Sequence, residues 1–453
     1  MLAKATFKEL LRLSLPMVVS QGAFAVMVFT DRWFMSQLDA VHIAATLGGG
    51  VASFFCISLF VGVISYANAL VAQYFGAGQF EKCPRVVSQG ALMALMSLPV
   101  LGLLTYFVGD LFSAMGHDPR QVELERVYFY ILMSGCFFTL LKICIASYFA
   151  GIGRTKVVMV CDVAGMLLNV PLSYVLIFGK LGLPQMGITG AALGTVVSSL
   201  FALLLFISFY FGRQHREYFS VFSSFHFDNK ILRRYLRLGI PSGLELFMNI
   251  ATFNLFLLMF QSYGVAQGAA MAIVFNWDML SFVPMIGLNI GVTSLIGRFV
   301  GAYDMTRANQ VIAAGFVVAI AYSGTLALLF INYRVPLVNI FATPTGDFGE
   351  IRELASFMMI GLSTYVIADA SILISGGVLR GAGDTRWLMV VSVSLHWLML
   401  IAQYFIIMVY ELGPRVSWWA FVAMILALAC VYLYRLLGGV WRHPERLAKV
   451  MAD

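Results

Sequence analysis

The sequence predicts an all-α integral membrane protein with twelve transmembrane helices in two parallel six-helix lobes. Three observations support this: the chain of 453 residues is 61% hydrophobic and 11% charged, apolar runs fill it almost end to end, and segments of its first half recur in its second. A bilayer span needs about 20 apolar residues. Backbone groups in lipid must pair internally, and continuous apolar runs without alternation favour helices over a barrel.

Glycine-containing turns or charged residues end the apolar runs. Phe75-Gly76-Ala77 closes the second run, Gly151-Ile152-Gly153 the fourth, Val300-Gly301-Ala302 the eighth and Gly381-Ala382-Gly383 the tenth. The spans are expected at residues 11–36, 43–74, 87–114, 123–149, 156–179, 187–212, 238–263, 268–300, 308–341, 352–379, 387–410 and 417–438.

The halves share short motifs at a nearly constant separation. The Gly-x-Gly-x-Thr pattern occurs at residues 151–155 and 381–385, and Leu11–Pro16 resembles Leu236–Pro241. Repeat-built membrane proteins are usually transporters whose substrate path lies where the repeats meet. We therefore expect an N-terminal lobe at 1–212, a cytoplasmic linker at 213–235, and a C-terminal lobe with a cytoplasmic tail at 236–453.

The basic residues predict the orientation. Most of the 29 Lys and Arg residues fall in the termini, the linker and the loops on the same side. The opposite loops carry Arg32, Arg120, Arg126, Lys180, Arg334, Arg352 and Arg415. Because cytoplasmic loops are enriched in Lys and Arg, both termini and the linker are expected in the cytoplasm. An even number of spans per half makes the repeats parallel.

Ionisable residues inside spans are costly and usually functional. Glu245 lies eight residues after Arg237, about 12 Å into the membrane at 1.5 Å per residue. Asp369 lies eleven residues before Arg380, about 17 Å from the same side. Tyr365 is one turn from Asp369 on the same face. The three are expected to form a site for Na⁺ or for shared protons; the alternative is two separately hydrogen-bonded structural acids.

Other intramembrane polar residues support weaker hypotheses. Asp31, near the outer end of the first span, is a functional candidate, although it could instead pair with the adjacent Arg32. Lys142 and Asp162 lie at similar depth on consecutive helices, so an internal salt bridge is favoured over a place in the cavity. Asp278 could line the cavity beside Asn276, with structural hydrogen bonding equally compatible.

Several classes of protein find no support. No GxxxxGK[ST] phosphate loop, HExxH or GxSxG motif is present, so an ATPase or another enzyme is not expected. The six cysteines are scattered without CxxC pairs, and no cofactor is expected. The net charge of +7 is explained by topology rather than by nucleic-acid binding.

The motifs together resemble the multidrug and toxic compound extrusion (MATE) family across nearly the whole chain. The resemblance rests on the two Gly-x-Gly-x-Thr segments, on Ala67–Gly78 and on Gly187–Thr195. It implies a cation-coupled antiporter that exports amphipathic, often cationic, drugs across the plasma membrane, in bacteria the inner membrane. It also implies multidrug efflux driven by the inward movement of Na⁺ or H⁺. We expect the protein to be a monomer.

Within that family the chain is similar to the NorM branch. The resemblance implies a cation site at Glu245, Tyr365 and Asp369, with Na⁺ held at the two carboxylates, and an N-lobe cation or substrate site at Asp31 and Asn169. Arg32 and Ser36 depart from the family pattern beside Asp31. The runner-up hypothesis is a lipid-linked glycan flippase of the same superfamily, favoured only by Lys142. A third is a non-transporting membrane receptor or assembly protein.

Overall fold

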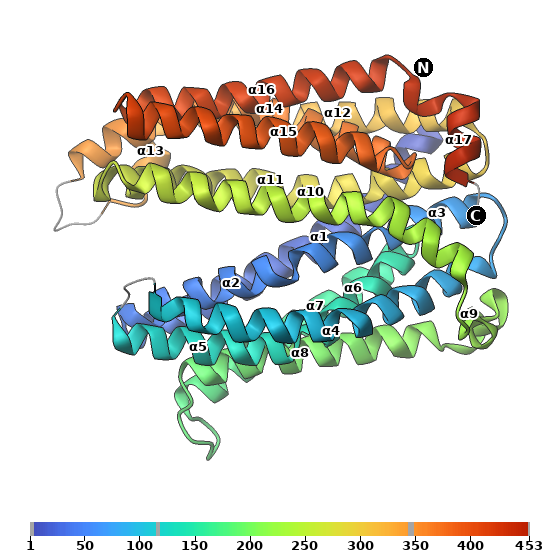
Figure 1. Cartoon of the computed structure of the whole chain (residues 1–453), viewed down its shortest axis with the longest axis horizontal. Coiled ribbons are helices and arrows are strands. Elements are labelled where there is room, and N and C mark those ends of the chain that lie inside the picture. The colour runs from blue at the N-terminus through green and yellow to red at the C-terminus, as the bar shows by residue number, and fades with distance from the viewer. Residues whose placement is uncertain (1–3, 115–117, 343–347, 452–453) are drawn as a thin grey trace. The chain divides into compact units, whose positions relative to one another are not determined.

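The computed structural model describes residues 4–114, 118–342 and 348–451, and this part of the chain is helical without any strand (Figure 1). The long helices are α1 (Lys4–Ser36), α2 (Ala40–Ser65), α4 (Lys82–Ala114), α5 (Pro119–Ser134), α6 (Cys136–Gly151), α7 (Thr155–Phe178), α8 (Ile188–Tyr210), α10 (Asn229–Gln261), α11 (Val265–Gly301), α12 (Met305–Asn332), α14 (Gly349–Gly381), α15 (Thr385–Tyr404) and α16 (Pro414–Leu437). The short ones are α3 (Ala67–Gly76), α9 (Arg213–Phe219), η1 (Val221–Ser224), α13 (Arg334–Asn339), η2 (Phe405–Val409), η3 (Val440–Arg442) and α17 (Pro444–Met451).

Eleven helices among the described residues are long and apolar enough to cross a membrane, and the bent pair α5–α6 makes up to twelve. The all-helical membrane fold predicted from composition is therefore confirmed. The bend of 47° between α5 and α6 falls at Gly135. A Cβ atom there would lie 2.7 Å from the side chain of Val196 on α8. Close packing thus requires glycine at the break, which interrupts the span predicted at 123–149.

Two other predicted spans are also interrupted. The span predicted at 43–74 consists of α2 and α3, which are separated at Tyr66. The span predicted at 308–341 consists of α12, a break at Tyr333, and α13. The run around Tyr66 carries no charged residue, so hydropathy alone could not locate that break, whereas Asn332 and Arg334 flank the break at Tyr333.

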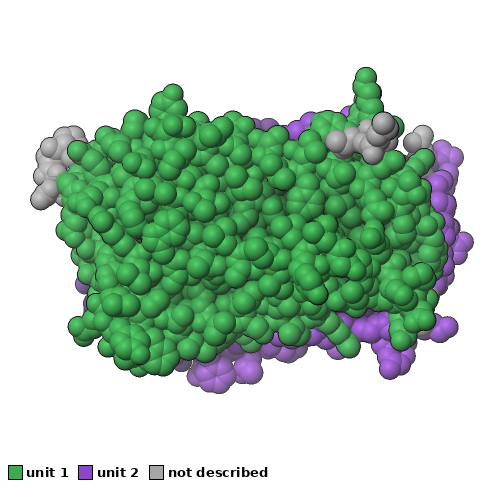
Figure 2. Space-filling view, turned by 90° about the horizontal axis from the view of Figure 1, so that it is seen from above, with its two compact units in different colours: residues 1–14, 248–452 green, residues 15–247, 453 purple. Residues whose placement is uncertain are grey.

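The contacts divide the chain into two compact units, which Figure 2 colours separately. One unit comprises residues 15–247, and the other comprises residues 1–14 and 248–452. We call them the N-unit and the C-unit. Helices α1 and α10 each contribute to both units. The expected lobe boundaries at 212 and 236 remain a prediction about the repeat.

In the N-unit, α2 and the first half of α10 approach backbone to backbone. A Cβ atom on Gly62 would lie 2.6 Å from the Cα of Gly243, and one on Gly243 would lie 2.5 Å from the carbonyl oxygen of Leu59. Tyr235 donates a hydrogen bond of 2.6 Å to the carbonyl of Ile64. Small residues permit such close helix packing in membranes, and this packing fixes the part of α10 that carries Glu245.

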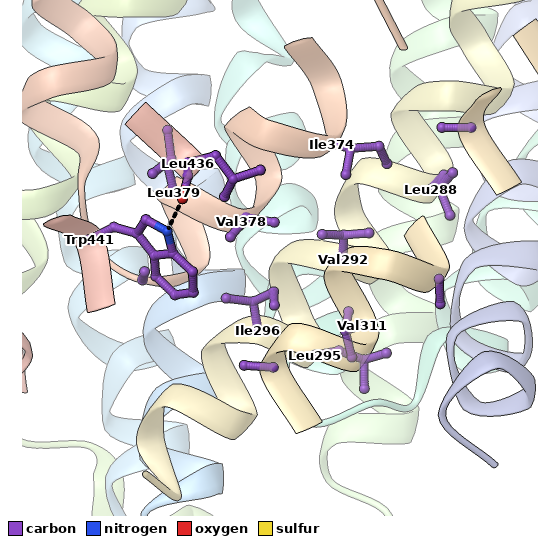
Figure 3. Packing of buried hydrophobic residues seen from close by; sticks show 14 of the residues in the cluster. Leu288, Val292, Leu295, Ile296, Val311, Ile374, Val378, Leu379, Leu436 and Trp441 are labelled. Atoms are coloured by element: carbon purple, nitrogen blue, oxygen red, sulfur yellow. Dashed lines mark hydrogen bonds between the residues drawn. The ribbon is translucent and has the colours of Figure 1, made fainter. Parts of the chain in front are cut away.

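In the C-unit, α11, α12, α14 and α16 surround a buried apolar core (Figure 3). The C-terminal parts of α11 and α14 run side by side, because Thr293 donates to the carbonyl of Gly377 at 3.2 Å. A Cβ atom on Gly381 would lie 2.8 Å from the carbonyl oxygen of Thr293. The two helices therefore end at the same end of the unit.

A short helix follows the last span of each half and packs near the Gly-x-Gly-x-Thr turn of that half. In the N-unit, α9 places buried His215 against Tyr148, whose hydroxyl lies 2.9 Å from His215 Nε2. In the C-unit, α17 contributes Arg446, which donates to the buried carboxylate of Asp384, and Val450 contacts Gly383. The segment expected as a linker at 213–235 thus contains α9, η1 and the beginning of α10.

Candidate functional site

The C-unit brings two carboxylates and a phenol together inside the spans. Tyr365 on α14 is fully buried, and its hydroxyl lies close enough to interact with Asp278 on α11. Asp369, one turn after Tyr365, interacts with the charge of Asp278. We call these three residues the Tyr365 cluster. Sequence reasoning placed Asp278 only among possible cavity residues, whereas the fold makes it a member of the site.

Packing holds the phenol of Tyr365 in place. Its ring meets Trp418 and Phe421 of α16 edge-on, with centroids 6.1 and 5.9 Å away. The indole of Trp418 is itself fixed by a hydrogen bond of 3.0 Å to the carbonyl of Met358. An aromatic wall therefore orients the hydroxyl toward the carboxylates.

The Tyr365 cluster has unused hydrogen-bonding capacity. The Tyr365 hydroxyl and Asp278 Oδ1 are buried, and among the described residues neither has a partner of normal hydrogen-bond geometry. Neither Asp278 nor Asp369 forms a salt bridge with Lys or Arg in the part of the chain that the structure describes. Buried polar atoms are nearly always satisfied, so the cluster is suited to bind a proton, a cation or a cationic group.

Glu245 belongs to the N-unit and is described by itself. Glu245 is 4% exposed and lies two residues after Gly243, which makes a tight contact with α2. Phe247, two residues further along α10, packs against Phe55 of α2 with ring centroids 4.8 Å apart and the rings tilted by 31°. The helix α10 passes into the C-unit after Phe247, and the grouping of Glu245 with Asp369, with or without Na⁺, stays a prediction.

The N-unit contains a second polar cluster around Asp31. The carboxylate of Asp31 is buried and accepts a hydrogen bond of 3.1 Å from Thr195 on α8. Ser173 on α7 lies close enough to interact with the same carboxylate. Asn169, one turn before Ser173, is fully buried, and neither polar atom of its amide has a partner in the part of the chain that the structure describes. We call these four residues the Asp31 cluster.

Direct pairing between Arg32 and Asp31 does not occur. Arg32 is exposed, and within the described residues Asp31 keeps one carboxylate oxygen without any partner. Consecutive side chains of a helix point to different faces, so Arg32 is directed away from the buried carboxylate. The alternative of an Asp31–Arg32 pair is therefore wrong.

Lys142 and Asp162 form the internal salt bridge that their depth predicts. Lys142 Nζ lies 3.7 Å from Asp162 Oδ1, and both side chains are partly buried. The hydroxyl of Ser20 on α1 also donates to Asp162. The salt bridge joins α6 and α7, and the bond from Ser20 adds α1. A role of either residue in the transport cavity stays a prediction.

The remaining cavity candidate binds its own helix. Asn276 Nδ2 donates to the carbonyl of Ala272 at 2.9 Å, and the residue is exposed. The neighbouring Trp277 Nε1 is buried and has no hydrogen-bond partner within the described ranges. Over the described residues, no group of three or more His, Cys, Asp or Glu gathers to hold a metal ion. Any bound Na⁺ would need hydroxyl or carbonyl oxygens besides the carboxylates.

This many membrane-spanning helices with buried, unpaired carboxylates is typical of transporters. The comparisons with known proteins agree. The model of the MatE family matches residues 16–175 and 241–405, so the chain belongs to the MatE family of multidrug transporters. It is a multi-pass membrane transporter rather than an enzyme.

Distant relatives carry the NorM name. The chain is 25% identical over 452 residues to a probable multidrug resistance protein NorM from Mannheimia succiniciproducens, covering 98% of this chain and 96% of that protein. It is 26% identical over 399 residues to a probable multidrug resistance protein NorM from Pasteurella multocida, covering 87% and 84%.

Solved structures share the fold. A multidrug resistance MATE family transporter of the MOP superfamily, in an outward-facing conformation, matches with a TM-score of 0.86 at 19% identity, covering 99% of this chain and 97% of that one. A MOP superfamily transporter from Pyrococcus furiosus, described as having a binding pocket of reversed polarity, matches with a TM-score of 0.85 at 20% identity, covering 99% and 97%.

Residue spacing did not indicate that Asp278 belongs with Asp369. Counted from Arg298 at 1.5 Å per residue, Asp278 lies about 30 Å along its helix, which separates it in depth from Asp369. That arithmetic assumes straight, parallel helices of equal length. Helix α11 contains Pro284, which lacks a backbone N–H and permits a bend, so residue spacing is a poor measure of depth in this helix.

Proposed function

We propose that this protein is a Na⁺- or H⁺-coupled antiporter that exports amphipathic, often cationic, organic compounds across the plasma membrane. The observation that carries the proposal is the Tyr365 cluster. Two carboxylates close together in a low-dielectric interior repel each other unless a proton or cation offsets one charge. A site that must acquire and release one positive charge is what cation-coupled exchange requires.

The two clusters have different proposed roles. Entry of the coupling cation at Asp278 and Asp369 competes with a cationic substrate or changes the packing around Tyr365. The Asp31 cluster, with its unsatisfied Asn169 amide, provides a further cation or substrate site. Glu245 is proposed as an additional cation ligand on α10. Rocking of the repeats then alternates access to the two sides.

Both termini are proposed to lie in the cytoplasm. The start of α1 packs at the end of the C-unit where α11 ends, because Arg298 Nη1 lies 3.2 Å from Glu9 Oε1. The C-terminal helix α17 packs where α14 ends, through Arg446 and Asp384. Since α11 and α14 end together, both termini occupy one end, and the positive-inside rule assigns that end to the cytoplasm.

A transport assay on reconstituted vesicles tests the proposal. Efflux of a fluorescent organic cation is driven in separate experiments by a Na⁺ jump and by a pH jump, and one of them should support transport. Asp369→Asn and Asp278→Asn should each reduce driven efflux at least tenfold. Tyr365→Phe should retain the fold and weaken coupling.

A matched control uses Asn276→Ala, because Asn276 bonds only to its own helix. It should transport as the parent protein does. Undiminished gradient-driven efflux in both aspartate variants, with normal amounts in the membrane, would refute the assignment.

The flippase alternative loses its one supporting residue. An anionic lipid-linked glycan needs basic groups in the cavity, and Lys142 was the candidate. Asp162 lies 3.7 Å from its ammonium group and offsets the charge. Transport of a lipid-linked glycan by vesicles that fail to move organic cations would restore the alternative.

A further inference from the structure

A surface groove runs between α12 and α16 of the C-unit and has a volume of about 340 Å³. Both helices pack against α14, and the groove occupies the space between them. It is lined by Asn309, Ile312 and Phe316 of α12, by Leu433, Leu436 and Leu437 of α16, and by Trp441 and Arg442 of η3. The groove takes no part in the transport sites described above.

The groove is apolar along its length and polar at one end. Asn309 lies near the beginning of α12, and Arg442 follows the end of α16. Arg442 Nη1 donates to Asn309 Oδ1 at 3.3 Å. Ile312 and Phe316 continue along the same face of α12 away from that end. The lining therefore matches a molecule with an acceptor group at one end and a hydrocarbon chain at the other.

The polar end is held rigidly. Gly439 turns the chain after α16 with a left-handed φ of 69°. Trp441 is then buried against the core, and its indole donates a hydrogen bond of 3.0 Å to the carbonyl of Leu436 (Figure 3). Because Trp441 is fixed, the adjacent Arg442 is held at the mouth of the groove.

Arg442 differs from Arg307, Arg435 and Arg446 of the same unit. Arg435 and Arg446 both pair with Asp384, and Arg307 pairs with Asp304. Arg442 is exposed and has no carboxylate partner within the described residues. Its guanidinium has five N–H donors, and the bond to Asn309 leaves most of them available. This positive charge favours an anionic oxygen ligand.

The flanks of the groove face the bilayer. On α16, Leu437 is 78% exposed and Tyr434 is 80% exposed, and in a membrane helix such residues contact lipid. A molecule that enters the groove laterally is therefore a lipid. Basic pockets between transmembrane helices at the membrane surface bind anionic headgroups.

We propose that this groove is a binding site for an anionic phospholipid, with the phosphate on Arg442 and Asn309 and one acyl chain along Ile312, Phe316 and Leu433. With the proposed orientation of the chain, the lipid belongs to the cytoplasmic leaflet. Its presence would couple the lateral packing of α12 and α16 to membrane composition. The site is independent of the transport assignment.

Native mass spectrometry of the full chain in detergent tests the site. Phosphatidylglycerol and phosphatidylcholine with identical acyl chains are titrated separately, and phosphatidylglycerol should bind more tightly. A basic residue near the surface contributes about 1 kcal/mol to anionic-lipid binding, so Arg442→Gln should weaken phosphatidylglycerol binding about fivefold. Binding of phosphatidylcholine should not change.

Two matched comparisons separate the groove from general charge and surface effects. Arg415→Gln removes an exposed arginine at the other end of α16 and should leave lipid binding intact. Ile312→Trp fills the groove and should reduce phosphatidylglycerol binding, whereas Leu328→Trp, on exposed surface of the same helix, should not.

Equal affinity of the unmodified protein for the two lipids would overturn the proposal without needing any variant. Displacement of the lipid by millimolar glycerol phosphate would also overturn it, because the site would then be one for free phosphate. Unchanged binding in a monodisperse Arg442→Gln protein would do the same, as would equal losses in Ile312→Trp and Leu328→Trp.

Discussion

A buried carboxylate contributes to holding the C-terminal helix α17 on the C-unit, and removing the charge of this carboxylate has a calculable effect. The side chain of Asp384 is 0% exposed and accepts from Arg435 Nε at 2.9 Å. It also accepts from Arg446 of α17. Asp384→Asn keeps the shape of the side chain and removes its charge, so both arginines lose their ionic partner.

The magnitude follows from the exposure of the two arginines. Removing one partner of a buried ion pair costs about 3–5 kcal/mol. Arg446 is the partner that lies on α17, and it is 34% exposed. It therefore regains some hydration, and the lower value of about 3 kcal/mol applies. Since 1.4 kcal/mol corresponds to a factor of ten, undocking of α17 should become roughly 100-fold more frequent.

Hydrogen-exchange mass spectrometry of the detergent-solubilised protein measures this directly. Protection of the α17 amides should fall by about two orders of magnitude in Asp384→Asn, while that of α11 stays unchanged. Asp304→Asn is the matched control, because Asp304 caps α12 and pairs with Arg307 at the surface. Exposed pairs contribute about 0–1 kcal/mol. Protection of α17 within twofold of the parent in Asp384→Asn would refute the reasoning.

Three further predictions concern the N-unit. Gly243→Val should lower the free energy of unfolding by about 1–3 kcal/mol through overpacking against α2. Gly102→Val should leave the free energy of unfolding unchanged, because an added Cβ there meets nothing within 4 Å. Burial lowers the pKa of His215 to about 4, so docking of α9 is favoured above the ordinary pKa near 6.5 and weakens as the pH falls toward 4. Exchange of the α9 amides, corrected for intrinsic rates, should show this, and His215→Phe should abolish it. Lys142→Met and Asp162→Asn should each destabilise the protein more than the double variant does, because each single change leaves one charge unpaired; additive losses on thermal unfolding would contradict the ion pair.

The sequence determined the features that depend on local composition. Apolar runs of sufficient length must become helices in a bilayer, because no other open structure satisfies the backbone there. The depth of Lys142 and Asp162 on consecutive helices was enough to predict their salt bridge. The repeated glycine turns predicted where the helices end, and the structure has α6 ending at Gly151 and α14 at Gly381.

The tertiary structure decided what depends on how each helix is rotated and bent. A helix that is apolar on all sides has no amphipathic face to indicate which residues point inward. The sequence therefore could not show that Asp278 meets Tyr365, or that Arg32 turns away from Asp31. Those rotations are fixed by contacts between distant segments, such as Tyr365 with Trp418 and Asp31 with Thr195, and such contacts are not encoded in the hydropathy of any one span.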